Sequence, residues 1–529
     1  MRKSRLLGPA LVTVAAAAVF GGSTGAAADS GFPRATANTD VAQNNKSSVR
    51  DMAIANVAVD PNDARHIAVV GGDWRLGTCN LYVSTDGGTT FSVGKRSPLP
   101  AQFDTCTPNG GTNAWGIAFD KSGNILVALM AANRPSTISI SGSIVLAKTS
   151  DNGNTWQTTI VKDNRQTTPP QGAGQIQLAV DNARNRIYVG WQQRGVTVSG
   201  YSGTQRRAEV AVSTDGGASF GQPVDVEGDP ASTLSVGGPS MSVGPDGTLW
   251  VFYSQSSAPK GSATVFSSQK PGLKVADSSD GGSTFTQAGT ILATAPAFFG
   301  FPNLAAGAYK GGTALVLVYE AIAQGAAGSQ YQLRDIWSQN STDGGSTWST
   351  PTRVTDDDIG TDLGNKFVPG VAAAPNGRFD AAWIDFRDDN GNLLSNTYYA
   401  SSSDGGTTWS KNVKVSDAPS NRHYGQFANY SDVRSNVNIA SNNYAANIVW
   451  DDSRQASPSA DLQDIYFGAV QQAAIPESTS TTVLYIIAAV AGGLVAASLI
   501  LVGAGLLIRR RRSGGRPTAA PPMAGTPTS

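Results

Sequence analysis

One eight-residue pattern recurs six times along this chain of 529 residues and limits its possible folds more than any other feature. The pattern is Ser/Thr-x-Asp-x-Gly-x-Ser/Thr followed by Phe or Trp, and successive copies lie 61 to 65 residues apart. Its six aspartates are Asp86, Asp151, Asp215, Asp280, Asp343 and Asp404. A sequence that resembles itself at a nearly fixed period indicates a fold built from repeated units.

Each copy follows a short run rich in β-forming residues, such as Asn80–Val83, so we interpret it as the turn of a β-hairpin. In such a turn the Asp side chain accepts backbone hydrogen bonds and Gly adopts a positive φ. A second turn signal precedes each copy, for example Asp120–Asn124. Two hairpins per period predict four antiparallel strands, named A to D here, and hence the blades of a β-propeller.

The predicted number of blades is seven. After the sixth pattern, residues 438–450 read as another A–B hairpin and Asp464–Tyr466 as a C strand, but no seventh pattern follows. We expect Asn38–Gln43 to supply the missing D strand, because it precedes the first A strand as Val413–Ala418 precedes a later one. Such closure pairs the open edges of the first and last blades. The predicted fold class is therefore all-β, a seven-bladed propeller closed by an N-terminal strand.

Both ends of the chain indicate export and membrane anchoring. Residues 1–28 combine a basic start, an apolar run and a small-residue end at Ala26–Ala28, which is typical of a secretory signal peptide. Val483–Ile508 contains no charged residue and is followed by four arginines, which predicts one C-terminal transmembrane helix with a cytoplasmic C-terminus. The predicted segments are signal peptide 1–28, ectodomain 29–470, stalk 471–482, transmembrane helix 483–508 and a basic, Pro-rich cytoplasmic tail 509–529, which makes a single-pass protein of the cell membrane with its propeller outside.

Charge and composition exclude several function classes. Lys plus Arg and Asp plus Glu both number 39, but eight basic residues lie in the predicted signal peptide and tail. The predicted exterior therefore carries 31 basic and 39 acidic residues, a net charge of −8. Nucleic-acid binding is not expected of such a chain. Two Cys and two His also exclude zinc fingers and multi-histidine metal centres.

The repeated turn resembles the Asp-box, or BNR repeat, of the sialidase (neuraminidase) superfamily, over roughly residues 38–470. The resemblance implies that the box aspartates are structural. It also implies a ligand cleft on the face formed by the B–C and D–A connections, called the loop face here. The activity it implies is glycoside hydrolysis of the exo-α-sialidase type. The alternative is a non-catalytic cell-surface module that binds a glycan or another surface ligand, and it is favoured by the seventh blade and the absent Phe/Tyr-Arg-Ile-Pro signature.

A Trp-x-Asp-x-Arg motif marks the ends of two predicted B strands and supplies the first candidate site. Its members are Trp383, Asp385 and Arg387 in blade six and Trp450, Asp452 and Arg454 in blade seven, joined by Arg75 in blade one. Period-two spacing puts each motif on one side of its strand. The three arginines would then converge on a substrate carboxylate beside catalytic carboxylates. The other interpretation is an inter-blade ion pair beneath a packing Trp. Blade three carries a related Trp191-Gln-Gln-Arg194.

Tyr319 and Glu320 form the second catalytic candidate, since the resemblance implies a Tyr nucleophile assisted by Glu. Only four Glu occur in the chain. Adjacent residues of a strand point to opposite faces, however, so this pair needs a bulge to act together.

Two further expectations concern cross-links and metals. Cys79 and Cys106 predict a disulfide, because both map to the loop face of an exported protein. The acidic run Asp356–Asp358 with Asp362 predicts either a Ca²⁺ site or a solvated charge run. No other metal or cofactor is expected, and the oligomeric state is not predicted.

Overall fold

In the computed structural model, every regular element within the described residues is a β-strand. The described residues are 33–42, 52–73, 78–92, 95–96, 115–133, 141–164, 167, 171–197, 204–228, 234–237, 239–257, 272–291, 302–322, 333–358, 364–424, 437–456 and 463–473. This part of the chain holds no helix long and apolar enough to cross a membrane. The predicted signal peptide, transmembrane helix and tail lie outside it, as does most of the predicted stalk.

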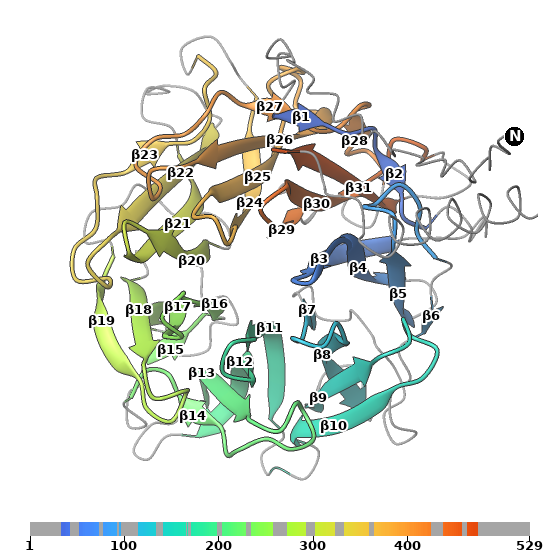
Figure 1. Cartoon of the computed structure of the whole chain (residues 1–529). Coiled ribbons are helices and arrows are strands. Elements are labelled where there is room, and N and C mark those ends of the chain that lie inside the picture. The colour runs from blue at the N-terminus through green and yellow to red at the C-terminus, as the bar shows by residue number, and fades with distance from the viewer. Residues whose placement is uncertain are drawn as a thin grey trace, which may run out of the picture.

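The described strands form seven antiparallel sheets arranged as a ring, which the chain follows once from blue to red (Figure 1). Blade one contains β3 (Met52–Asp60), β4 (Asp63–Asp73), β5 (Thr78–Ser84) and β6 (Lys95–Arg96). Blade two contains β7 (Trp115–Phe119), β8 (Ile125–Asn133), β9 (Ser141–Thr149) and β10 (Gln157–Lys162). Blade three contains β11 (Gly172–Asp181), β12 (Arg186–Thr197), β13 (Thr204–Ser213) and β14 (Val224–Asp225).

The remaining blades repeat this order with small variations. Blade four contains β15 (Leu234–Val236), β16 (Ser240–Val243), β17 (Leu249–Ser257), β18 (Gly272–Ser278) and β19 (Thr286–Thr290), its A strand being split in two. Blade five contains β20 (Asn303–Tyr309), β21 (Gly312–Ile322), β22 (Arg334–Ser341) and β23 (Thr352–Arg353). Blade six contains β24 (Lys366–Ala373), β25 (Phe379–Asp385), β26 (Leu394–Ser402), β27 (Val413–Lys414) and β28 (Ser420–Asn421). Blade seven contains β29 (Val437–Ser441), β30 (Ala445–Asp452) and β31 (Asp464–Gln471).

The N-terminal segment completes blade seven, as the sequence predicts. Both β1 (Arg34–Ala35) and β2 (Thr39–Asp40) pair antiparallel with β31, the C strand of that blade (Figure 1). Between them, Asn38 receives the Asp417 backbone N–H on Oδ1 at 2.8 Å and donates from Nδ2 to the Val415 carbonyl at 2.9 Å. Asn412, just before the D strand of blade six, makes the same two bonds to Asp356 and Val354, at 3.0 and 3.0 Å. The first described residues therefore occupy a true D-strand position.

The core of the molecule lies between the blades. Seven clusters of buried apolar residues occur in the described part of the chain, and each joins two successive blades. The cluster between blades seven and one includes Val41 and Ala42 from the N-terminal segment, beside Phe467 of β31. Every blade is thus covered on both faces by its neighbours, which a ring provides without leaving an apolar face in water.

Each Asp-box closes its own turn through the same set of hydrogen bonds. In blade four, the Ser278 hydroxyl donates to Asp280 Oδ1 at 2.8 Å, while the Thr284 N–H and hydroxyl donate to its two carboxylate oxygens at 3.0 and 2.6 Å. The equivalent bonds recur in the other five boxes. Both carboxylate oxygens of each box aspartate therefore accept hydrogen bonds from residues of the same turn.

Each box also packs on the blade before it. The second box glycine has a positive φ, and a Cβ on Gly282 would lie 2.5 Å from Val212 of blade three. A Cβ on Gly88 would lie 2.0 Å from Phe467 of blade seven. Glycine is therefore required there both for the backbone conformation and for the close approach.

Acid should weaken the fold through these turns. Hydrogen bonds from Thr284 lower the pKa of Asp280 to about 2, and those from Thr155 lower that of Asp151 to about 2. A lowered folded-state pKa contributes stability that is complete above the ordinary carboxyl value of 3.8 and is lost as the pH falls through 2. We expect the free energy of unfolding in urea to drop between about pH 4 and pH 2, with a shallower drop in Asp280→Asn. Equal slopes for both proteins would contradict this role.

The N-terminal closure predicts a matched pair of destabilised variants. Asn38→Ala and Asn412→Ala each remove equivalent inter-blade hydrogen bonds, so both should lower the free energy of unfolding by about 1–3 kcal/mol. Asn390→Ala, at an exposed turn position, should change it by less than about 0.5 kcal/mol. Denaturant unfolding measures all three, and a neutral Asn38→Ala would argue against closure by this segment.

Candidate functional site

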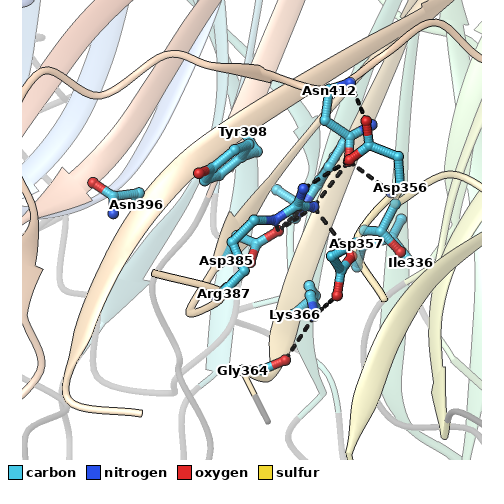
Figure 2. A network of polar contacts seen from close by, with 12 residues as sticks. Ile336, Asp356, Asp357, Gly364, Lys366, Asp385, Arg387, Asn396, Tyr398 and Asn412 are labelled. Atoms are coloured by element: carbon cyan, nitrogen blue, oxygen red, sulfur yellow. Dashed lines mark hydrogen bonds and ion pairs between the residues drawn. The ribbon is translucent and has the colours of Figure 1, made fainter. Parts of the chain in front are cut away.

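The blade-six motif is held in a closed network between blades five and six (Figure 2). The Trp383 indole N–H donates to Asp385 Oδ2 at 2.8 Å, and Arg387 Nε donates to the same oxygen at 2.9 Å. The remaining guanidinium nitrogens of Arg387 donate to Asp356 Oδ1 and Asn412 Oδ1, both at 2.8 Å. Burial raises the pKa of Asp385, and the Arg387 charge opposes that shift.

Blade seven repeats this network around Arg454. The Trp450 indole donates to Asp452 Oδ2 at 2.7 Å, and Arg454 Nε donates to that oxygen at 2.9 Å. The other guanidinium nitrogens of Arg454 bond to Asp417 and, at 3.2 Å, to Asn38 Oδ1. The N-terminal segment thus enters the same network that Asn412 enters in blade six.

Of the two interpretations of the motif, this geometry favours the inter-blade ion pair. Asp385 is 0% exposed and Asp452 2% exposed. The arginines are covered by aromatic rings as well, with Arg387 4.4 Å from the Tyr398 ring centroid and Arg454 4.2 Å from that of Tyr466. Both arginines donate hydrogen bonds to two aspartates and one asparagine of the chain itself. Arg75 lies outside the described residues, so its place relative to them stays a prediction.

Tyr319 and Glu320 point to opposite sides of β21, as the strand period predicts. Tyr319 is 1% exposed and donates to Gln339 Oε1 at 3.2 Å, and burial raises the pKa of its hydroxyl. Glu320 accepts a hydrogen bond from the Val368 N–H at 3.2 Å and lies 3.7 Å from an Arg334 nitrogen. The two side chains are buried in different seams and do not form a pair.

The acidic D–A loop is built into the protein's own ion pairs where it is described. Asp357 binds Lys366 Nζ at 2.5 Å and Arg353 Nη2 at 2.9 Å, while Asp356 binds Arg387 (Figure 2). No group of three or more His, Cys, Asp or Glu in the described part could hold a metal ion. Asp362 lies outside that part, so the Ca²⁺ expectation stays untested.

Cys79 is buried in β5 and is disulfide-bonded. Cys106 lies outside the described residues, and its pairing with Cys79 stays a prediction.

Blade three differs from the motif, and its arginine has no carboxylate partner among the described residues. The Trp191 indole donates to Gln193 Oε1 at 2.8 Å, so a neutral amide stands where blades six and seven have a carboxylate. Arg194 follows Trp191 by three residues rather than four, and the odd spacing turns it to the other face of β12. Gln192, on that same face, donates to the Val236 carbonyl of blade four at 2.7 Å. Arg194 therefore faces the seam between blades three and four.

The surroundings of Arg194 are cationic and polar. Its Cα partner across the ladder is Arg206 of β13. Its Nε donates to Gln192 Oε1 at 2.9 Å, and within the described residues it has no carboxylate partner. Burial first, and then the Arg206 charge, lower the pKa of Arg194 to about 10. A Cβ on Gly174 of the inner strand β11 would lie 2.4 Å from Arg194 Nη2.

Blade three also carries buried polar atoms that its own residues leave without hydrogen bonds. Both amide atoms of Gln205, which is 1% exposed, lack a partner, as do Glu209 Oε2 and Gln175 Oε1. Such atoms also occur in blade seven, for example Tyr466 Oη, and Gln205 and Glu209 lie on the face of β13 opposite to Arg206. The cationic surroundings of Arg194, rather than these atoms, therefore mark blade three as a candidate functional region. The sequence contained the signal: Gln at the Asp position and a spacing of three. Arg194 is not among the site residues predicted from the sequence.

Comparisons with known proteins support the fold. No family model matches the chain, and no curated protein does. Among solved structures, an ulvan lyase described as a new family of polysaccharide lyase, PL25, aligns with a TM-score of 0.50 and 10% identity over 85% of this chain and 98% of its own. The Hadza microbial sialidase Hz136 aligns at 0.43 and 14% over 78% and 74%. The α-L-arabinanase of Penicillium chrysogenum, complexed with arabinobiose, aligns at 0.41 and 15% over 66% and 94%. The predicted resemblance is confirmed at the level of the propeller fold.

A structural role for Asp385 predicts a large loss of stability on its removal. Asp385→Ala leaves Arg387 and the Trp383 indole without their shared acceptor inside a seam, which should cost about 3–5 kcal/mol of unfolding free energy. Lys414→Ala in the same blade breaks only the exposed pair with Asp388, whose carboxylate keeps its hydrogen bonds from Asn396 and Tyr398, and should cost less than about 1 kcal/mol. Denaturant unfolding compares the two. If Asp385→Ala were as stable as the wild type, a structural role would be contradicted and a catalytic role for Asp385 would again be a hypothesis.

Proposed function

We propose that this chain is an extracellular, membrane-tethered propeller that binds a glycan on its loop face. The observation that carries the proposal is the contrast between equivalent positions around the ring. In blades six and seven the motif arginine is neutralised by the chain's own aspartate. In blade three the equivalent strand end keeps a guanidinium without a carboxylate partner among the described residues, opposite a second arginine in the ladder.

Binding is preferred to hydrolysis because of where the nominated catalytic groups lie. Asp385, Asp452, Tyr319 and Glu320 are each at most 4% exposed. A general acid or nucleophile must reach the scissile bond, and these four side chains are instead packed in seams and hydrogen-bonded there. Saccharides offer many hydroxyl donors and acceptors, which suits the polar character of blade three.

Exo-glycosidase action of the exo-α-sialidase type is the second proposal. The observation in its favour is that all six Asp-boxes, which carried the resemblance, form the turns expected of them. The ulvan lyase with which the chain shares its fold is named as a polysaccharide lyase, so that protein also acts on a sugar polymer, although by elimination and not by hydrolysis.

One preparation of the full-length chain tests both proposals. We expect it to bind members of a panel of immobilised glycans, neutral and acidic, with micromolar to millimolar affinity, and to release no product from fluorogenic sialosides or other glycosides. Product release would favour the hydrolase. A folded protein that binds no glycan, with folding checked by thermal unfolding, would contradict glycan recognition.

A further inference from the structure

The Arg194–Arg206 pairing is costly in the absence of a ligand. Like charges directly opposite each other on antiparallel strands repel, and these two are Cα partners in the β12–β13 ladder. Burial adds a desolvation cost that a nearby carboxylate would normally offset. Burial and the Arg206 charge both lower the pKa of Arg194, and no acidic side chain among the described residues raises it. An anion bound here would relieve both costs.

One hydrogen bond orients the forked guanidinium group of Arg194. Gln192 Oε1 accepts from Nε, and that bond leaves the two terminal nitrogens without a hydrogen-bond partner in the described part of the chain. The guanidinium lies against Gly174 on the innermost strand, where the absence of a side chain makes room for it. Gly174 has no positive φ, so space rather than backbone conformation explains the glycine.

The fork selects the ligand by shape as well as by charge. Two parallel N–H groups of an arginine match the two oxygens of a carboxylate, or two of a sulfate, which a neutral hydroxyl cannot do. The predicted exterior has a net charge of −8, so attraction of a polyanion has to be local. We propose that Arg194 and Arg206, in the seam of blades three and four, form a subsite for an oxyanion substituent, a carboxylate or a sulfate, of the glycan.

This inference rests on the proposed glycan binding and names the class of ligand. Three polymers with one backbone test it: dextran, carboxymethyl-dextran and dextran sulfate. The full-length chain should bind at least one charged polymer about tenfold or more tightly than dextran, the gain expected of one charge-assisted fork. Whichever polymer is preferred identifies carboxylate or sulfate as the source of the oxyanion.

Three variants separate a positioned guanidinium from a mere positive charge. Arg194→Gln should remove the preference for the charged polymer. Gly174→Ala keeps every charge but places a methyl group where the guanidinium lies, so it should also lower affinity for the charged polymer by about tenfold. Arg184→Gln removes an equal charge from an A–B turn on the opposite end of blade three, where Arg184 pairs with Asp181, and should leave affinity unchanged. Thermal unfolding of each variant checks the fold.

The outcomes distinguish the subsite from the function on which it rests. Equal affinity of wild type and Arg194→Gln for the charged polymers, or no preference over dextran, would overturn the subsite, while binding of neutral glycans would leave the proposed function standing. Inorganic sulfate tests the subsite in the absence of a glycan. If sulfate raises the melting temperature of wild type but not of Arg194→Gln while no glycan binds, the subsite is supported and glycan recognition is overturned.

Discussion

The fold depends on the need to cover both apolar faces of every blade. Each of the seven apolar clusters in the described residues belongs to two successive blades, so no blade has a core of its own. The ring satisfies this need only if the last blade meets the first, and the N-terminal segment joins them by pairing with β31 and by packing Val41 and Ala42 into the last seam. Stability is therefore shared around the ring, because the loss of one seam exposes two faces.

The same network of polar side chains reinforces two of the seams, at blades six and seven. An arginine at the end of a B strand binds its own aspartate, an aspartate of the preceding blade and an asparagine at the start of a D strand. In blade seven that asparagine is Asn38, which comes from the other end of the chain. Blade three keeps the buried Trp191 but replaces the aspartate by Gln193 and turns its arginine to the opposite seam. The comparison of the three blades therefore assigns a structural role to the arginines of blades six and seven and leaves that of blade three as a candidate ligand site.

Much of the fold was predictable because it follows from local rules. The box pattern specifies a turn by hydrogen bonds within eight residues, and its period sets the size of a blade. Even the N-terminal closure could be predicted, since the segment occupies the position of a D strand relative to the next A strand. The opposite directions of Tyr319 and Glu320 likewise follow from the strand period alone. The candidate site was less predictable, because a motif of Trp, Asp and Arg suits a ligand clamp and an ion pair equally well.

The sequence by itself determined the repeat, the number of blades and the parity that decides which face of a strand each side chain takes. Only the tertiary structure decided which arginines are already neutralised, because the carboxylates that bind Arg387 and Arg454 come partly from the preceding blade, 31 and 37 residues away in the chain. It also decided that Arg194 lies over Gly174 beside Arg206, since those contacts arise only when three strands of blade three are paired in register. Charge pairing across a seam is set by distance in space, and a strand pattern carries no information about it.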